Sequence, residues 1–227
     1  MSLNICNGFE VQKVIGYSPP ERNSEFQVLA PGWQLIPQTN ADLGIRMQTF
    51  FDDLFASQNS ESVGQGPEIE PAPDLESSGM QPDADDQLAI LIGSDSPHLP
   101  TRVVEEAFQH LVDHDVVLGP SIDGGYYLIG ARNQTPDIFH GIDWSTDKVL
   151  EQTLGQLESK GYKYCLLPPF RDIDDLDDLK WLLNDLRKSN SEELDNQELI
   201  LRIEEALGEL GSDLTANSDT SGNKVEP

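Results

Sequence analysis

The sequence predicts an α/β domain with a mostly parallel central sheet and helices on both faces. Short apolar runs alternate along the chain with longer segments that carry an apolar residue at every third or fourth position. The apolar runs, such as LAILI at 88–92, also lack the in-and-out alternation of a half-exposed sheet. Both faces of their sheet should therefore be covered, as in doubly wound folds.

The expected elements follow in order. A short strand near 11–15 runs into a loop with two prolines, and Asn40 is expected to cap a helix whose apolar stripe begins at Leu43. The later expected elements are strands at 88–92, 116–119, 126–130 and 162–168, and helices at 101–114, 146–159 and 176–187.

The domain organisation follows from composition. We expect one domain over 1–188, a further helix over 189–211 and a disordered tail over 212–227. The segment at about 59–86 combines Ser, Gly, Pro and acidic residues with few apolar ones. Because such a segment cannot offset the entropy cost of ordering, we expect a disordered acidic insertion there.

Composition also limits the function classes. Fourteen Lys and Arg against 41 Asp and Glu give a formal net charge of -27, which repels nucleic-acid phosphates and anionic lipid surfaces. The two cysteines form neither a disulfide framework nor a zinc motif, and no apolar run approaches membrane-spanning length. We expect a cytoplasmic protein that binds neither nucleic acid nor a membrane, and whose oligomeric state is open.

The strand at 88–92 is followed by a carboxylate. In LAILIGSDSPHLP, Gly93 lets the chain turn, and Asp95 stands where open α/β sheets bind ligands, beyond the carboxyl ends of the strands. A carboxylate there suits a hard cation such as Mg²⁺ or Mn²⁺, which in turn binds phosphate oxygens. The alternative is that Asp95 caps the next helix, but Thr101 is better placed as that cap.

A second acidic cluster, RDIDDLDDL at 171–179, precedes and opens a helix. Acids in a first helical turn are expected from the helix dipole alone, which accounts for the three later ones. Asp172 and Asp174 lie outside that turn, and the alternation of an extended segment points both to one side. Either residue could complete a two-carboxylate metal site with Asp95.

The segment GPSIDGGYYLIG at 119–130 places Asp123 and two glycines before an aromatic-rich strand. As an isolated motif, an Asp-Gly pair most often marks a hairpin turn. The chain lacks the motifs of serine hydrolases, P-loop enzymes and dinucleotide-binding domains, so those three chemistries are disfavoured.

Taken together and in order, these segments resemble the bacterial DUF2064 proteins, often described as glycosyltransferases of the nucleotide-diphospho-sugar transferase (GT-A) superfamily. The resemblance covers roughly residues 11–183. It rests on a series of sequence motifs: Trp33 with Gln38, LGIRM, LIGSDSPHLP, VVLGPSIDGGYYLIG, IDWST and DIDDLDDL. It implies a GT-A fold and a divalent metal, Mg²⁺ or Mn²⁺, held by Asp95 and Asp174, with Asp172 as the second choice.

The resemblance also implies a substrate site. The residues near the acceptor or the sugar would be Asp123, as the general base, with Gly124, Gly125 and Tyr126. The residues close to the nucleotide base or phosphates would be Gln38 and Arg46. Two further residues would help to close the pocket, namely Trp144 and Ser145.

Members of this family begin with a strand and a glycine-containing loop that bears a Lys-Thr-Arg run and cradles the nucleotide phosphates. Residues 1–16 hold no such loop, so we expect the GT-A domain to be N-terminally incomplete. A sheet edge exposed in this way would favour instability or self-pairing.

The implied activity is metal-dependent transfer from a nucleotide-diphospho-sugar to a small-molecule acceptor. One alternative is a nucleotidyltransferase of the molybdopterin or phospholactate guanylyltransferase type, in which the same metal site serves attack at the α-phosphorus and pyrophosphate leaves. Another is a non-catalytic GT-A-like remnant that binds a ligand or a partner without turnover.

Overall fold

The computed structural model describes residues 4–6, 9–59, 86–188 and 197–208. The chain divides into two compact units: unit 1 comprises residues 1–93 and 100–171, and unit 2 comprises residues 94–99 and 172–227. The predicted insertion, apart from its first and last residues, and the predicted tail lie outside the described residues. Within the described part of the chain, no helix is long and apolar enough to cross a membrane.

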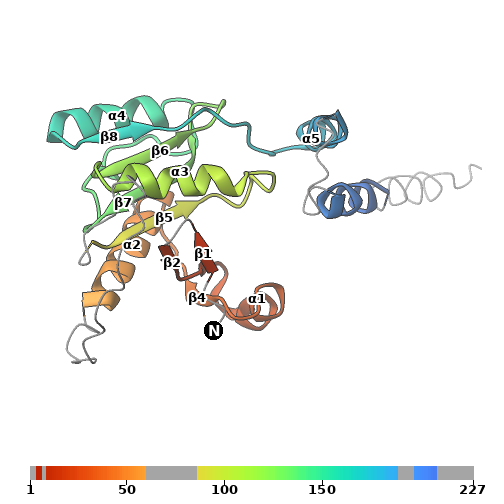
Figure 1. Ribbon diagram of the computed structural model, residues 1–227, viewed down its shortest axis with the longest axis horizontal. Coiled ribbons are helices and arrows are strands. Elements are labelled where there is room, and N and C mark those ends of the chain that lie inside the picture. The colour runs from red at the N-terminus through yellow and green to blue at the C-terminus, as the bar shows by residue number, and fades with distance from the viewer. Residues whose placement is uncertain (1–3, 7–8, 60–85, 189–196, 209–227) are drawn as a thin grey trace, which may run out of the picture. The chain divides into compact units, whose positions relative to one another are not determined.

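Unit 1 is built around a four-stranded sheet with the order β5-β7-β6-β8 (Figure 1). Its strands are β5 (Leu88–Ile92), β6 (Val116–Pro120), β7 (Tyr126–Arg132) and β8 (Tyr164–Leu166). All four coincide with predicted strands, because their apolar runs are long enough to be recognised locally.

Strand β7 departs from the mostly parallel pattern. It pairs antiparallel with both β5 and β6, whereas β6 and β8 are parallel. Three strands of the sheet therefore run in one direction and β7 opposes them. The physical reason is the turn at 121–125, which sends the chain straight back beside β6 as a hairpin.

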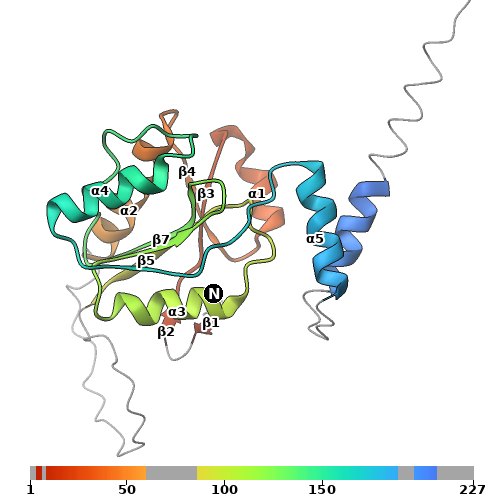
Figure 2. The same cartoon turned by 90° about the horizontal axis from the view of Figure 1, so that it is seen from above.

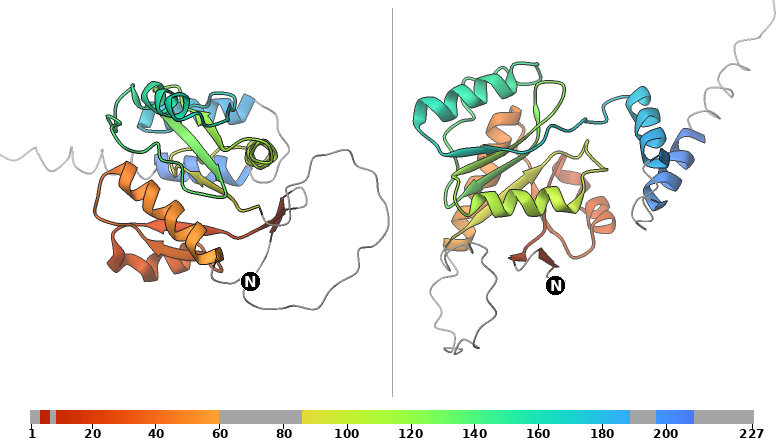
Figure 3. Two further views of the ribbon diagram at one scale, coloured as in Figure 1. Left: turned by 90° about the vertical axis from the view of Figure 1, so that its left-hand side faces the viewer. Right: turned by 45° about the horizontal axis from the view of Figure 1, so that its top comes forward.

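Helices cover both faces of this sheet, as predicted. Helix α3 (Thr101–Leu111) lies on one face, and α2 (Leu43–Asn59) and α4 (Val149–Lys160) lie on the other (Figure 2 and the right view of Figure 3). Helix α2 is capped by Asp42, whose Oδ1 accepts a hydrogen bond from the backbone N–H of Ile45 over 2.9 Å. The predicted cap, Asn40, stands too early in the chain for that role.

Successive residues of β7 point to opposite faces of the sheet and so pack against the helices on both faces. Ile129 belongs to the core that contains Phe51 of α2 and Leu157 of α4. Its neighbour Gly130 faces the other side, where a Cβ atom on this glycine would lie 2.9 Å from Leu111 Cδ1 of α3. Full burial of each large apolar side chain in such a core contributes roughly 1.5–3 kcal/mol.

A second, parallel pair of strands belongs to the same unit. Strands β3 (Val14–Tyr17) and β4 (Gln34–Pro37) are connected by the short helices η1 (Pro20–Arg22) and α1 (Asn23–Leu29). Neither α1 nor β4 was predicted, because α1 buries no residue and so has no apolar stripe, and β4 is short and ends in a proline. Among the described residues, β3 pairs only with β4, and β5 only with β7.

A small hairpin precedes this pair. Strand β1 (Asn4–Cys6) is antiparallel to β2 (Phe9–Val11).

Unit 2 contains a pair of helices. Helix α5 (Leu176–Lys188) lies beside a helix at 197–208 (Figures 1 and 2), and Leu182 and Leu186 pack with Ile203 in a small core. The periodic apolar stripes predicted both helices. The predicted division of the chain at residue 188 stays a prediction.

Candidate functional site

The turn between β6 and β7 is held by its own side chains. Oδ1 of Asp123 accepts a hydrogen bond from the Ser121 hydroxyl and a second, over 3.0 Å, from the backbone N–H of Gly125. The backbone N–H of Ser121 donates to the carbonyl of Gly125 over 3.1 Å. One carboxylate oxygen of the exposed Asp123 is thus engaged in the turn, and only its Oδ2 remains to meet a ligand.

Gly124 lets this turn approach the start of α4 closely. Its φ is +93°, and a Cβ atom built on it would lie 2.3 Å from the backbone oxygen of Asp147. Its own carbonyl accepts a hydrogen bond from the backbone N–H of Leu150 over 2.8 Å. Glycine is therefore required at this position for two reasons: the left-handed backbone conformation, and the lack of space for a Cβ atom.

Tyr126 points towards the core. Its hydroxyl donates to Met47 Sδ over 3.9 Å, and its ring packs against the main hydrophobic cluster. Burial raises the pKa of this hydroxyl above its ordinary value. Its predicted contact with the substrate stays a prediction, and its observed contacts are with the core and Met47 of α2.

Trp144 and Ser145 lie in the segment before α4. The Trp144 indole lies against α2, where a Cβ atom on Gly44 would be 2.5 Å from Nε1 of the indole. Ser145 is exposed and has a left-handed backbone, with φ of +63°. The structure thus brings this segment into contact with the LGIRM motif at the start of α2. Through Asp147, the segment also contacts the turn at 121–125.

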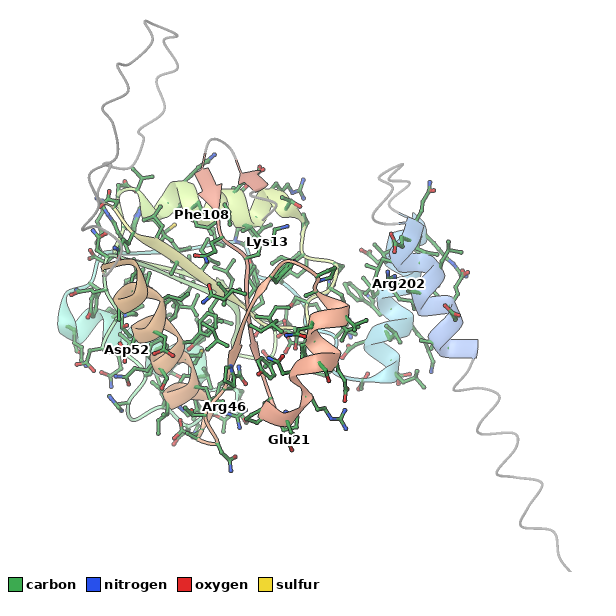
Figure 4. The ribbon with its side chains drawn as sticks, turned by 90° about the horizontal axis from the view of Figure 1, so that it is seen from below. Lys13, Glu21, Arg46, Asp52, Phe108 and Arg202 are labelled. Carbon is green, nitrogen blue, oxygen red and sulfur yellow. The ribbon has the colours of Figure 1, made fainter. Side chains whose placement is uncertain are left out.

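Gln38 and Arg46 are brought together at one small cavity beside the end of β4. Arg46, labelled in Figure 4, donates from Nε to the carbonyl of Ala41 over 2.8 Å. The cavity measures about 10 Å³, and its lining comprises Ile36, Pro37, Gln38, Thr39, Arg46, Thr49, Phe50 and Asp53. Such a volume holds one water molecule at most, so a nucleotide base would need these side chains to move or would bind above them.

Unit 2 brings the two predicted metal-binding segments together. The backbone N–H of Ile173 donates to the carbonyl of Asp95 over 2.8 Å. The Ser96 hydroxyl donates to Oδ1 of Asp172 over 3.0 Å. The turn that holds Asp95 therefore lies beside the segment that holds Asp172, and the side chains of Asp95 and Asp174 are exposed.

The later acids of the cluster have structural roles, as the helix dipole predicted. Oδ1 of Asp175 accepts hydrogen bonds from the backbone N–H groups of Asp177 and Asp178, over 2.8 and 2.9 Å, and so caps α5. The prediction that Thr101 caps the helix after Asp95 is wrong. Helix α3 begins at Thr101 with Pro100 at the cap position, and it has no side-chain cap because proline has no side-chain oxygen to accept a hydrogen bond.

The donor set fits a magnesium-like ion only in part. Within the described segments, no group of three or more His, Cys, Asp or Glu side chains is arranged to hold a metal. Mg²⁺, however, is often bound by one or two carboxylates together with substrate phosphates and water. Two carboxylate segments joined by a backbone hydrogen bond match that minimal set, with Asp95 on one and Asp172 and Asp174 on the other.

His98 is expected to make the stability of unit 2 depend on pH. The half-buried imidazole lies 6.1 Å from the Trp181 ring, and burial lowers the pKa of His98 below its ordinary 6.5, although Asp185 opposes this. Because the unfolded chain then binds the proton more tightly, stability is present in full above about pH 6.5 and falls as the pH drops through the folded pKa. Urea unfolding from neutral to mildly acidic pH should show this loss, with a flatter profile for His98→Gln. Equal profiles for the two proteins would contradict it.

Comparison with known proteins adds to this geometry. A family model, DUF2064, described as an uncharacterized protein conserved in bacteria, matches residues 5–146. The chain belongs to the DUF2064 family. No curated protein matches it. The match includes every predicted substrate residue and Asp95, and it ends before Asp172 and Asp174.

A solved structure extends the similarity beyond residue 146. The chain is similar to the crystal structure of a candidate nucleotide-diphospho-sugar transferase from Desulfovibrio desulfuricans G20, with 28% sequence identity and a TM-score of 0.64. The similarity covers 89% of this chain and 78% of that chain. The predicted membership of DUF2064 and the predicted GT-A-like α/β class are therefore confirmed.

Proposed function

We propose that this DUF2064 chain is a metal-dependent glycosyltransferase that acts on a nucleotide-diphospho-sugar. The observation that carries the proposal is the backbone hydrogen bond between Ile173 and Asp95, which joins two acidic segments far apart in the sequence. The description of the similar structure as a candidate nucleotide-diphospho-sugar transferase supports the same chemistry.

The metal would be Mg²⁺ or Mn²⁺, held by Asp95 and Asp174, with Asp172 as the alternative to Asp174. When bound, it would neutralise the negative charge that develops on the diphosphate leaving group. The charge of the chain favours the use of such a cation. With a formal net charge of -27, the protein repels a diphosphate, and the repulsion is strongest beside its carboxylates.

The protein's own residues would bind and orient the substrates. Gly124 and Gly125 would bind the sugar through backbone groups of the turn, and the close packing of Gly124 on the Asp147 backbone would keep that turn in place. Oδ2 of Asp123 would accept the proton of the attacking acceptor hydroxyl, while Oδ1 keeps the turn in place. Arg46 has further guanidinium N–H groups beyond Nε, and these suit phosphate oxygens.

Thermal unfolding with Mn²⁺ and a panel of nucleoside diphosphates and their sugars tests the proposal. A ligand present at about 100 times its Kd stabilises the folded state by about 2.7 kcal/mol. We expect a rise in the unfolding midpoint that needs both Mn²⁺ and one particular nucleotide. Asp95→Ala should abolish the rise, whereas Asp177→Ala should keep it, because Asp177 is exposed and pairs with Lys180.

Two outcomes contradict the proposal. One is the absence of any shift in protein that unfolds cooperatively, which favours the non-catalytic remnant. The other is a full shift in Asp95→Ala. Product analysis then separates the two transferase chemistries, because a glycosyltransferase releases the nucleoside diphosphate and a nucleotidyltransferase releases pyrophosphate.

A further inference from the structure

The segment before α4 is held by a reciprocal pair of hydrogen bonds. We call residues 143–147 the tryptophan loop. The backbone N–H of Asp143 donates to Oε1 of Gln152 over 2.7 Å, and Nε2 of Gln152 donates to Oδ2 of Asp143 over 2.8 Å. The Thr146 hydroxyl donates to the carbonyl of Asp143 over 2.7 Å. The base of the loop is thereby tied to a half-buried side chain on α4.

The loop stores backbone strain at its exposed tip. Ser145 has φ of +63°, a conformation that is unfavourable for residues other than glycine. Such strain persists only where the surrounding structure over-determines the conformation. The bonds made by Gln152 to Asp143, one to its backbone and one to its side chain, lie two residues before Ser145.

The loop also touches two predicted substrate segments. Its Trp144 indole packs against Gly44 of α2, close to Arg46 in the chain. Its Asp147 backbone packs against Gly124 of the turn. A displacement of the loop would therefore disturb the packing both at α2 and at the turn that carries Asp123.

We propose that Gln152 is a positioning residue for the substrate site. Through its two hydrogen bonds to Asp143, it holds the tryptophan loop so that Trp144 stays against α2 and Asp147 stays against Gly124. This inference rests on the proposed function, because the ligand that benefits from the fixed turn is the nucleotide-diphospho-sugar.

The position of the loop can be measured without any ligand. Replacing Trp33 and Trp181 by Phe leaves Trp144 as the only fluorescent tryptophan. In that background, Gln152→Ala should raise the acrylamide quenching constant of Trp144 by about twofold or more, since local opening exposes the indole. Gln156→Ala is the matched control, because this half-buried side chain, one turn further along α4, donates to the carbonyl of His140 over 3.4 Å. We expect no change for the control.

A reversed pair tests the hydrogen bonds themselves. Gln152→Glu places a carboxylate against that of Asp143 and should raise the quenching constant as Gln152→Ala does. Adding Asp143→Asn makes residue 143 the donor and residue 152 the acceptor, so the quenching should return to the parental value. A merely structural loss of packing on α4 would not be rescued in this way.

Ligand binding completes the test. With Mn²⁺ and the nucleotide sugar that stabilises the parent protein, Gln152→Ala should weaken the apparent affinity roughly tenfold, and the reversed pair should restore it. Unchanged quenching in Gln152→Ala overturns the inference, as does raised quenching with unchanged affinity. If the parent protein responds to no member of the panel, the proposed function fails, while the quenching result still decides whether Gln152 holds the loop.

Discussion

Asp86→Ala is expected to lower the free energy of unfolding by about 3–5 kcal/mol, because it removes the buried carboxylate that pairs with the largely buried Arg132. The Asp86 side chain is 6% exposed, and Arg132 contacts it with Nη2 over 2.7 Å and Nε over 3.0 Å. Asn133 donates to the same carboxylate over 2.9 Å. The pair connects the end of β7 to the residues just before β5.

Chemical denaturation of three variants measures this effect. Glu25→Ala removes the exposed pair with Arg22, whose side chains are 60% and 61% exposed, and should cost less than about 1 kcal/mol. Asp86→Asn keeps the shape and an acceptor oxygen and should lie between the two. A loss below about 1 kcal/mol for Asp86→Ala would mean that Arg132 finds water or another partner in the variant.

Gly124→Ala is expected to lower the free energy of unfolding by about 2–5 kcal/mol. About 1–2 kcal/mol comes from forcing a residue with a Cβ atom into the left-handed region. A further 1–3 kcal/mol, roughly, comes from overpacking against the Asp147 backbone, which lies 2.3 Å from the added atom. Because backbone cannot rotate away as a side chain can, the turn or the start of α4 has to move.

Gly161→Ala provides the matched comparison. Gly161 ends α4 with φ of +72°, and a Cβ atom there meets nothing within 4 Å. Its replacement should cost only the backbone contribution of about 1–2 kcal/mol. Equal losses in the two variants would show that the contact between Gly124 and Asp147 relaxes without cost.

Much of the fold was predictable because its signals are local. The apolar runs of β5, β6 and β7 and the apolar stripes of α2, α3 and α5 are each read within a few neighbouring residues. The Asp-Gly pair at 123–124 predicted a hairpin, and that hairpin is what turns β7 against its neighbours. Helix α1 was not predicted, because Val28 and Leu29 are exposed and its apolar residues do not form a buried face.

The candidate site was predictable only where a general rule placed it. Ligands of open α/β sheets gather beyond the carboxyl ends of strands, and this rule singled out Asp95. No such rule predicts the hydrogen bond between Asp143 and Gln152, since the two residues lie nine positions apart across a turn. Gly44 likewise looked like an ordinary helix residue, and only the Trp144 indole beside it explains why a larger side chain would not fit.

By itself, the sequence determined the family, the α/β class, and the strands and helices with strong periodicity. It also singled out the carboxylates that we propose carry the chemistry. Only the tertiary structure decided which distant residues meet: Asp95 with the segment of Asp172, Asp86 with Arg132, and the tryptophan loop with Gly124. The physical reason is range. Periodicity and capping act over a few residues of one segment, whereas these contacts join segments whose separation in the chain leaves no local pattern.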